Sequence, residues 1–216
     1  MAEKKYTPMM MHYIKLKEEN PDSILFYRLG DFYEMFFEDA KIASQELNLV
    51  LTGRSAGVEE KVPMCGIPYH AANSYIQRLV KKGYKVAICE QLSDPSQSKG
   101  LVDRGIIKII TPGTYMDSAL DEKQTNYMAS VSVSSFEIVV IYCELSTGEL
   151  KYQTLERSLV SLQKALMEQH VSEVVLPMSF DKRWLNAFEE MDSILVSLQK
   201  KTSLDSEDEK LLPLNP

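Results

Sequence analysis

Residues 25–40 are Leu25-Phe26-Tyr27-Arg28-Leu29-Gly30-Asp31-Phe32-Tyr33-Glu34-Met35-Phe36-Phe37-Glu38-Asp39-Ala40, two aromatic runs separated by a Gly-Asp dipeptide. A dipeptide of this kind between alternating apolar runs is the usual signal for a two-residue β-hairpin turn. Glu38 and Asp39 follow the second run, and acidic residues stabilise the first turn of a helix through its macrodipole. The stretch therefore predicts a strand, a tight turn, a second strand and a helix.

The predicted second strand fixes the direction of two side chains, Phe32 and Glu34. Successive side chains of a strand point to opposite faces, so this pair would project from one face while Tyr33 and Met35 project from the other. A helix that began at Asp31 would instead place Phe32 and Glu34 about 200° apart, since each residue advances by roughly 100°. The strand thus places Phe32 and Glu34 on one face, whereas the helix places them on nearly opposite sides.

The composition is that of an ordinary globular protein. The chain has 216 residues, 44% of them hydrophobic and 25% charged, which is enough for one large or two small domains. It has no run of about 18 apolar residues and no signal-peptide core at its start, so we expect a cytoplasmic protein without membrane contact. Cys65, Cys89 and Cys143 are odd in number and far apart, which favours reduced thiols over a disulfide framework or a metal knuckle.

Charge is distributed unevenly along the chain. The net charge is -7, which by itself argues against nucleic-acid binding because phosphate contacts need Lys and Arg. Residues 1–120, however, contain 15 basic and 15 acidic residues, whereas residues 121–216 contain 9 and 16. All of the excess acid lies in the second part, and any DNA binding by the neutral first part should be weak and strongly salt-dependent.

Apolar spacing and turn residues divide the rest of the first part into short elements. Thr7-Pro8 followed by Pro21 predicts a helix over 9–19, and a second amphipathic helix runs from Ala71 to a glycine cap at Gly83. The other expected elements are a helix through Ala40, Ala43 and Leu47, a strand at 49–52, a loop at 53–57 that holds Arg54, a rigid turn at 63–68, strands at 85–91 and 104–111, and a polar loop at 94–100.

The second part follows a linker at 114–124 that has no apolar periodicity. Three short strands are predicted there at 129–133, 136–145 and 149–154, joined as an antiparallel meander. The remaining elements are a helix marked by Leu155, Leu159, Leu162 and Leu166, a buried strand at 173–176, a helix at 182–191 that carries Trp184, and a polar loop at 200–216. A meander followed by alternating helices and strands indicates an α/β layer arrangement.

Five short blocks in about the first 115 residues resemble the N-terminal part of the bacterial MutS DNA mismatch-repair family. In order they are G-D-F-Y-E at 30–34, C-G-I-P-Y-H at 65–70, A-I-C-E-Q at 87–91, D-P-S-Q-S-K-G at 94–100 and I-T-P-G-T at 110–114. The resemblance implies a mixed α/β fold class. It further implies a mismatch-recognition domain at 1–113 with a mixed sheet flanked by helices, the linker at 114–124, and an incomplete ribonuclease H-like connector domain at 125–216.

The resemblance also implies functional residues. In the family the Phe and Glu of G-D-F-Y-E contact the mispair, and they correspond to Phe32 and Glu34; Arg54, Lys99 and Arg104 would contact the DNA backbone. A second F-x-E at 36–38 lacks the preceding Gly-Asp, so the role is not transferred to it. The pattern alone also allows Phe32 to be one more ring of an aromatic core, and Arg54 and Arg104 to be solvated surface cations.

A physical mechanism connects these residue types with mispair recognition. A mispair stacks poorly and bends easily, so a wedged aromatic ring forfeits less stacking there than in perfect duplex. Phe32 suits this role because an aromatic ring stacks on any base. For Glu34, which phosphates repel, the hypothesis is that a protonated form donates to a base acceptor, while matched duplex that presents no such base meets the repulsion.

Three functions compete at this point. The first is a non-enzymatic module that recognises mismatched duplex DNA. The second is a protein-interaction fragment whose acidic connector recruits a MutL-like partner and whose own DNA binding is negligible. The third, metal-assisted phosphodiester cleavage, needs converging carboxylates, whereas Glu137, Glu144 and Glu149 do not fall at one set of strand positions.

The nucleotide-binding motif G-x-x-x-x-G-K-[ST] does not occur in the sequence. The resemblance therefore implies that ATP, magnesium and the dimerisation of the family belong to clamp, lever and ATPase domains outside these residues. We expect the chain to be a monomeric fragment without catalytic residues, metal or cofactor.

Overall fold

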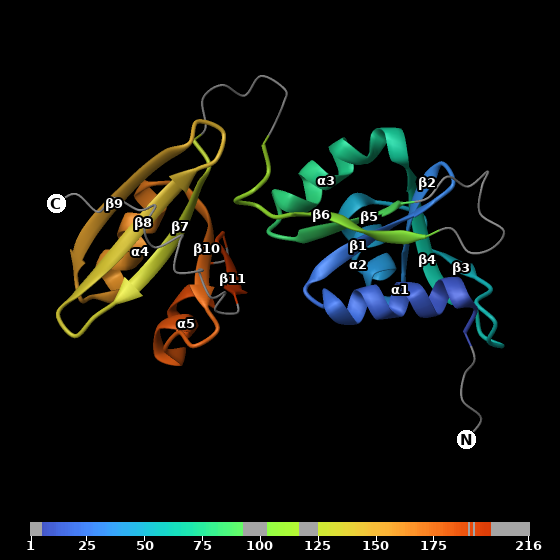
Figure 1. Cartoon of the computed structure of the whole chain (residues 1–216), viewed down its shortest axis with the longest axis horizontal. Coiled ribbons are helices and arrows are strands. Elements are labelled where there is room, and N and C mark those ends of the chain that lie inside the picture. The colour runs from blue at the N-terminus through green and yellow to red at the C-terminus, as the bar shows by residue number, and fades with distance from the viewer. Residues whose placement is uncertain (1–5, 93–102, 117–124, 190, 192, 200–216) are drawn as a thin grey trace. The chain divides into compact units, whose positions relative to one another are not determined.

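The computed structural model describes residues 6–92, 103–116, 125–189, 191 and 193–199. The chain divides into two compact units, Met1–Glu122 and Lys123–Pro216 (Figure 1). Each unit has a mixed β-sheet and its own hydrophobic packing, so the predicted mixed α/β class is confirmed. Within the described residues, no helix is both long and apolar enough to span a bilayer.

The first unit is built on a six-stranded sheet with the order β3-β4-β2-β1-β5-β6. Strands β1 and β5 run parallel, and every other neighbouring pair is antiparallel. The strands are β1 (Ser23–Leu29), β2 (Phe32–Phe36), β3 (Thr52–Arg54), β4 (Val62–Pro68), β5 (Lys85–Gln91) and β6 (Arg104–Ile110). The short strand β3 and the longer strand β6 form the two edges.

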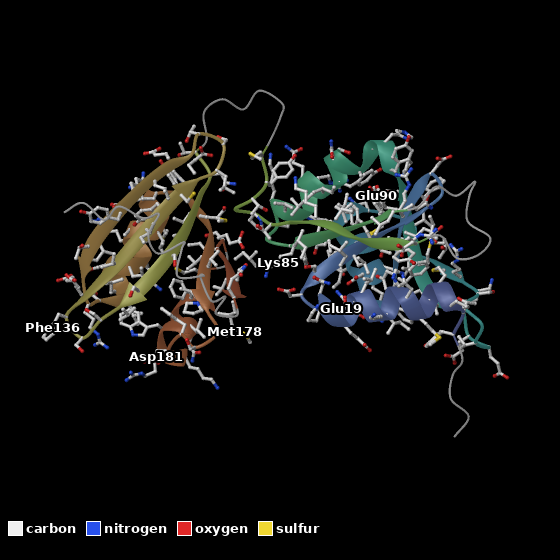
Figure 2. All side chains as sticks on the ribbon, in the orientation of Figure 1. Glu19, Lys85, Glu90, Phe136, Met178 and Asp181 are labelled. Atoms are coloured by element: carbon white, nitrogen blue, oxygen red, sulfur yellow. The ribbon has the colours of Figure 1, made fainter. Side chains whose placement is uncertain are left out.

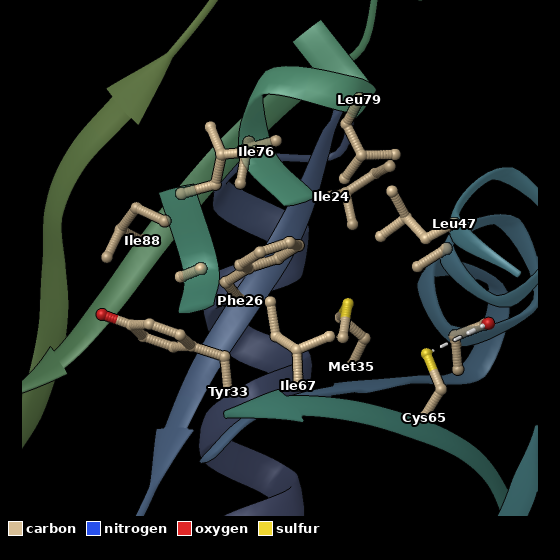
Figure 3. Packing of buried hydrophobic residues seen from close by; sticks show 14 of the residues in the cluster. Ile24, Phe26, Tyr33, Met35, Leu47, Cys65, Ile67, Ile76, Leu79 and Ile88 are labelled. Atoms are coloured by element: carbon tan, nitrogen blue, oxygen red, sulfur yellow. Dashed lines mark hydrogen bonds between the residues drawn. The ribbon is translucent and has the colours of Figure 1, made fainter. Parts of the chain in front are cut away.

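Helices cover both faces of this sheet. They are α1 (Pro8–Glu19), α2 (Phe37–Leu47) and α3 (Ala72–Val80), the last preceded by a 3-10 turn (Tyr69–Ala71). Helices α2 and α3 pack on one face, in a core that contains Tyr33 and Met35 of β2 (Figure 3). Helix α1 packs on the other face, where Tyr13 lies edge-on against Phe36 with ring centroids 5.0 Å apart. The side chains of β2 thus alternate between two cores.

The predicted strand, turn, strand and helix are confirmed. Leu29 of β1 pairs with Phe32 of β2, so the turn consists of Gly30 and Asp31 alone. Gly30 has a φ of +58°, a conformation that glycine adopts readily because it lacks a Cβ atom. Helix α2 follows β2 directly and begins at Phe37, whose φ is +53°. The alternative in which a helix begins at Asp31 is therefore wrong.

The two helices predicted from their caps are also confirmed. The Thr7 hydroxyl accepts a hydrogen bond from the Met10 amide at the start of α1, and Pro8 occupies the first helical position. Beyond the end of α3, Gly83 has a φ of +86°, as expected for a glycine that ends a helix. The predicted strands at 85–91 and 104–111 correspond to β5 and β6.

The predictions between α2 and β4 need correction. The strand expected at 49–52 begins only at Thr52, where pairing with Met64 of β4 starts. Asn48 ends α2 in the left-handed conformation, and the apolar residues that follow it form a connection to the sheet edge rather than a strand. Arg54, expected in a flexible loop, belongs to β3.

The rigid turn expected at 63–68 is also wrong, because these residues form most of strand β4. This strand pairs with β3 on one side and with β2 on the other, where Phe32 lies opposite Pro68. Pro63 and Pro68 lie near the two ends of the strand, where a missing amide hydrogen disturbs the ladder least.

The second unit contains a five-stranded sheet with the order β11-β10-β7-β8-β9. Strands β7, β8 and β9 form an antiparallel meander, and β10 runs parallel to both β7 and β11. The elements are β7 (Tyr127–Val133), β8 (Glu137–Glu144), β9 (Glu149–Glu156), α4 (Leu159–Glu168), β10 (Val171–Pro177), α5 (Lys182–Glu189) and β11 (Leu195–Gln199). Leu162 and Leu166 of α4 and Trp184 and Phe188 of α5 share one core with the sheet.

The meander, the buried strand and both helices of this unit were predicted, with two differences. Leu155, expected to begin the first helix, belongs to β9. Strand β11 was not predicted at all. The loops expected at 94–100 and 200–216 lie outside the described residues.

Candidate nucleic-acid interface

Phe32 is the aromatic residue of the hairpin that faces solvent. It is the first residue of β2, next to the turn, and 48% of its surface is exposed. Tyr33 and Phe36 of the same strand are buried, each in a different core. The alternative in which Phe32 belongs to the aromatic core is therefore wrong, and its ring is accessible to a ligand.

Glu34 lies on the same face of β2 as Phe32, as the strand prediction requires. Its Cα is opposite Gly66 of β4, and a Cβ atom added there would lie 3.5 Å from Glu34 Cγ and 3.3 Å from the Tyr33 carbonyl oxygen. The tighter of these two approaches is to the Tyr33 carbonyl oxygen, and the contact with Glu34 would be an ordinary van der Waals one. The Glu34 side chain is only 16% exposed and is ion-paired with the Arg54 guanidinium.

Arg54 comes from the edge strand β3 and reaches across the sheet face to Glu34. Its guanidinium carbon lies 5.9 Å from the centroid of the buried Phe36 ring, and its side chain is 35% exposed. A cation at this distance from a ring gains a modest attraction to the π face. Arg54 thus lies along the protein surface, ion-paired with a carboxylate and partly exposed.

Arg104 is mostly buried and is not a solvated surface cation. It is only 9% exposed, its Nε donates to the Arg28 carbonyl oxygen at 2.9 Å, and its guanidinium carbon lies 5.5 Å from the Tyr27 ring centroid. These contacts join the start of β6 to the end of β1, close to the hairpin turn. Lys99, the third predicted backbone contact, lies outside the described residues.

A cation–aromatic pair beside Phe32 was not predicted from the sequence. The Arg28 guanidinium carbon lies 3.7 Å from the centroid of the half-exposed Tyr69 ring, and Arg28 Nε donates to the Gly30 carbonyl oxygen. The Tyr69 amide donates to the Asp31 carbonyl oxygen at 3.0 Å, which attaches the end of β4 to the turn. The C-G-I-P-Y-H block contains Tyr69, so its position next to Phe32 follows from the pairing of β4 with β2.

The opposite side of the hairpin is held by a partly buried acceptor on β5. The Tyr33 hydroxyl donates to a carboxylate oxygen of Glu90, and Arg28 forms an ion pair with the same residue at 3.4 Å. Glu90 is labelled in Figure 2. Burial, reinforced by the hydrogen bond to Glu90, raises the pKa of Tyr33 to about 12, so its hydroxyl remains a proton donor at neutral pH. The turn that carries Phe32 is therefore fixed from both β4 and β5.

The carboxylates considered for metal binding in the second unit have other partners. Glu144 accepts hydrogen bonds from Ser146 and Thr147 in the loop that follows β8, which lowers the pKa of its carboxyl group to about 2. Glu149 accepts a hydrogen bond from the Tyr127 hydroxyl at 2.7 Å. Glu137 is exposed at the start of β8. The described contacts thus give Glu144 and Glu149 roles in joining strands and loops.

The second unit also exposes large apolar side chains. Phe136, in the hairpin between β7 and β8, is 89% exposed (Figure 2). Ile141 of β8 and Tyr152 of β9 are directly paired and both exposed, and Leu150 is exposed on the same face. Clusters of exposed apolar side chains are typical of protein-interaction surfaces.

Comparison with known proteins identifies the family. A family model described as MutS domain I matches residues 7–119. The DNA mismatch repair protein MutS of Clostridium botulinum (strain 657 / Type Ba4) is 65% identical over 144 residues, which cover 66% of this chain and 16% of that protein. The protein of the same name from Clostridium novyi (strain NT) is 48% identical over 196 residues, which cover 90% of this chain and 22% of that protein. The chain spans about a fifth of the length of these curated relatives. Because the family model covers more than half of the chain, the chain belongs to the MutS family.

Proposed function

We propose that the first unit of this chain recognises mismatched duplex DNA in mismatch repair, with Phe32 inserted beside the mispair. The observation that carries the proposal is the exposure of Phe32 at the tip of a rigid hairpin, on the same face as Glu34. The names of the relatives, DNA mismatch repair protein MutS, support the same assignment. The unit acts as a binding module without catalytic residues.

The energetics favour a wedge at a mispair over a wedge in perfect duplex. Unstacking a base step costs a few kcal/mol, and less where the stack is already damaged. A phenyl ring on the exposed base returns about 1 to 3 kcal/mol of stacking, whatever the base. Phe32 therefore senses how easily the duplex opens, which is a property that mispairs share.

Glu34 helps to discriminate mispaired from matched duplex because its carboxylate is repelled by the DNA phosphates. A carboxylate placed among phosphates is repelled, and it is compensated only where a mispaired base offers a hydrogen-bond partner. We assign to Glu34 a hydrogen bond to the mispaired base. Matched duplex presents no such partner and is disfavoured.

The remaining contacts are proposed for the DNA backbone. Arg54, Lys99 and Arg104 are the basic residues that we assign to phosphates, and Arg104 can act only at its small exposed edge. The first part of the chain has no net positive charge, so its affinity should be low and should fall steeply with salt concentration.

A fluorescence-anisotropy titration tests this proposal. The 216-residue chain is titrated into a labelled duplex with one G·T mispair and into the matched control, at low ionic strength. The proposal predicts tighter binding of the mispaired duplex. Equal affinity for the two duplexes, or no binding of either, would overturn it.

A second function is proposed for the second unit, namely contact with a protein partner such as a MutL-like protein. The exposed Phe136, Leu150 and Tyr152 favour it, because this apolar surface has no role within the described part of the unit. Calorimetric titration of the chain with a MutL-like protein tests it: Tyr152→Ser should weaken binding, and an unchanged affinity would exclude this face. We assign ATP hydrolysis, magnesium binding and dimerisation to the parts of the relatives that lie outside the matched region. The chain itself is proposed to be a cytoplasmic monomer.

A further inference from the structure

The ion pair between Arg54 and Glu34 joins two residues to which different DNA contacts are assigned. Arg54 comes from the sheet edge and Glu34 from the central hairpin, and their side chains meet over the buried ring of Phe36. Within the described residues this is the one ion pair that Glu34 makes. Glu34 is mostly buried, so a carboxylate left without this partner is costly.

We propose that Arg54 exchanges partners when DNA binds: its guanidinium leaves Glu34 for a backbone phosphate, and Glu34 must then find its partner on the mispaired base. The inference rests on the proposed function and adds to it a coupling between backbone contact and base recognition. Arg54 is thereby a specificity-determining residue as well as a source of affinity.

Charge and geometry support the exchange. The Arg54 guanidinium has several donors, is partly exposed, and lies on the face from which Phe32 projects, so a phosphate near the inserted ring competes directly with Glu34. In matched duplex, transfer of Arg54 to a phosphate leaves the Glu34 carboxylate unpaired near other phosphates. In mispaired duplex the base contact replaces the lost ion pair. Matched duplex therefore bears a penalty that the movement of Arg54 adds to the direct repulsion between Glu34 and the phosphates.

A double-mutant cycle separates this exchange from simple repulsion. If Glu34 only repels phosphates, Glu34→Gln should raise the affinity for matched duplex by the same factor whether or not Arg54 is present. If Arg54 exchanges partners, Glu34→Gln should raise that affinity by about fivefold in the presence of Arg54, the upper end of what a surface ion pair contributes, and by a clearly smaller factor in Arg54→Gln, where only the repulsion is relieved.

The salt dependence of DNA binding shows whether the Arg54 guanidinium contacts a phosphate in the complex. Each phosphate contact contributes about 0.9 to the slope of log affinity against log salt concentration. Arg54→Gln should therefore lower the slope by about that amount, and Arg54→Lys, which keeps the charge, should retain it. The pair Glu46 and Lys82, which joins α2 to the end of α3 and is linked at 2.6 Å, provides the matched control. Glu46→Gln should have the same effect on DNA affinity whether or not Lys82→Gln is also present.

The outcomes distinguish the exchange from the proposed function. Anisotropy titrations of G·T and matched duplexes with the four proteins of the cycle should show strong coupling between positions 34 and 54 and a reduced slope for Arg54→Gln. An unchanged slope, or equal effects of Glu34→Gln in both backgrounds while the wild-type chain still prefers the mispair, would overturn the exchange alone. Failure of the wild-type chain to prefer the mispair would overturn the proposed function and the exchange with it.

Discussion

Phe32 and Phe36 point to the same face of strand β2, four residues apart, yet Phe32 is half exposed and Phe36 is completely buried. The difference arises from α1, whose Tyr13 packs edge-on against Phe36 and whose hydroxyl accepts a hydrogen bond from the Phe36 amide at 3.2 Å. Phe32, next to the turn, is not among the residues of that core. Of the two F-x-E motifs in this stretch, only the one that begins at Phe32 can therefore present its ring to a ligand.

The turn that carries Phe32 should tolerate Gly30→Ala poorly. A Cβ atom at this position meets no other atom within 4 Å, so the whole effect comes from the φ of +58°. A left-handed conformation costs an L-residue about 1 kcal/mol or somewhat more. Denaturant unfolding followed by circular dichroism should show a loss of about 1 kcal/mol, whereas Asp31→Ala in the same turn should be nearly neutral. Equal stability of the two variants would contradict this account.

Local sequence signals predict the hairpin and the helices of the first unit. Gly30-Asp31 determines the turn by its own backbone preference, and Thr7-Pro8 and Gly83 mark helix ends in the same way. The exposed position of Phe32 follows from the strand that these signals define. About ten consecutive residues were thus enough to predict that Phe32 and Glu34 lie on one face of the strand.

Features that depend on pairing between distant segments could not be predicted. Pro63 and Pro68 suggest a turn when viewed locally, but pairing with β2 and β3 makes that segment a strand. The contact of Arg28 with Tyr69 depends on the same pairing. The burial of Arg104, for which the pattern alone allowed a solvated surface cation, results from its hydrogen bond to Arg28 of β1, 76 residues earlier in the chain. No local pattern reports such contacts.

The hairpin should depend on Asp39, a buried carboxylate at the start of α2. Asp39 accepts hydrogen bonds from the Tyr13 hydroxyl and the Leu25 amide, both at 3.0 Å, and forms an ion pair with Lys17 at 2.8 Å. It thereby ties α1, β1 and α2 together. Asp39→Asn keeps one acceptor but removes the charge, and should lower the free energy of unfolding by about 2 kcal/mol, less than for a fully buried pair because Lys17 is partly exposed.

A neighbouring substitution provides the control for Asp39→Asn. Glu38 is exposed, and the one ion pair that it forms with the described residues is to the exposed Lys41, so Glu38→Gln should change stability by less than about 0.5 kcal/mol. If Asp39→Asn is no more destabilising than Glu38→Gln in the same unfolding experiment, the network does not hold the hairpin on α2.

Acid should weaken the second unit through Glu144. Hydrogen bonds from Thr147 and Ser146 lower the pKa of this carboxyl group from its ordinary value of 4.5 to about 2 in the folded protein. A group whose pKa is lower in the folded state stabilises the protein above the unfolded pKa, and this contribution is lost as the pH falls through the folded pKa. The stability advantage of the wild type over Glu144→Gln should therefore be constant above about pH 5 and should disappear toward pH 2.

Trp184 provides the measurement for this prediction. It is the single tryptophan of the chain and is buried in the core of the second unit, so its fluorescence reports the unfolding of that unit. Glu137→Gln, at an exposed position of the same strand, serves as the control and should behave as the wild type at every pH. A difference between wild type and Glu144→Gln that does not change between pH 5 and pH 2 would show that Glu144 is not held in its charged form.

The ratio of affinities for a G·T duplex and its matched control, measured by anisotropy at low salt for the wild-type chain and for Phe32→Ala, tests the central claim most directly. Phe32 is half exposed, so its removal should leave the circular dichroism spectrum and the unfolding transition nearly unchanged. The account predicts a clear preference for the mispair in the wild type and a ratio close to one for Phe32→Ala. A folded Phe32→Ala chain that keeps the wild-type ratio would contradict it.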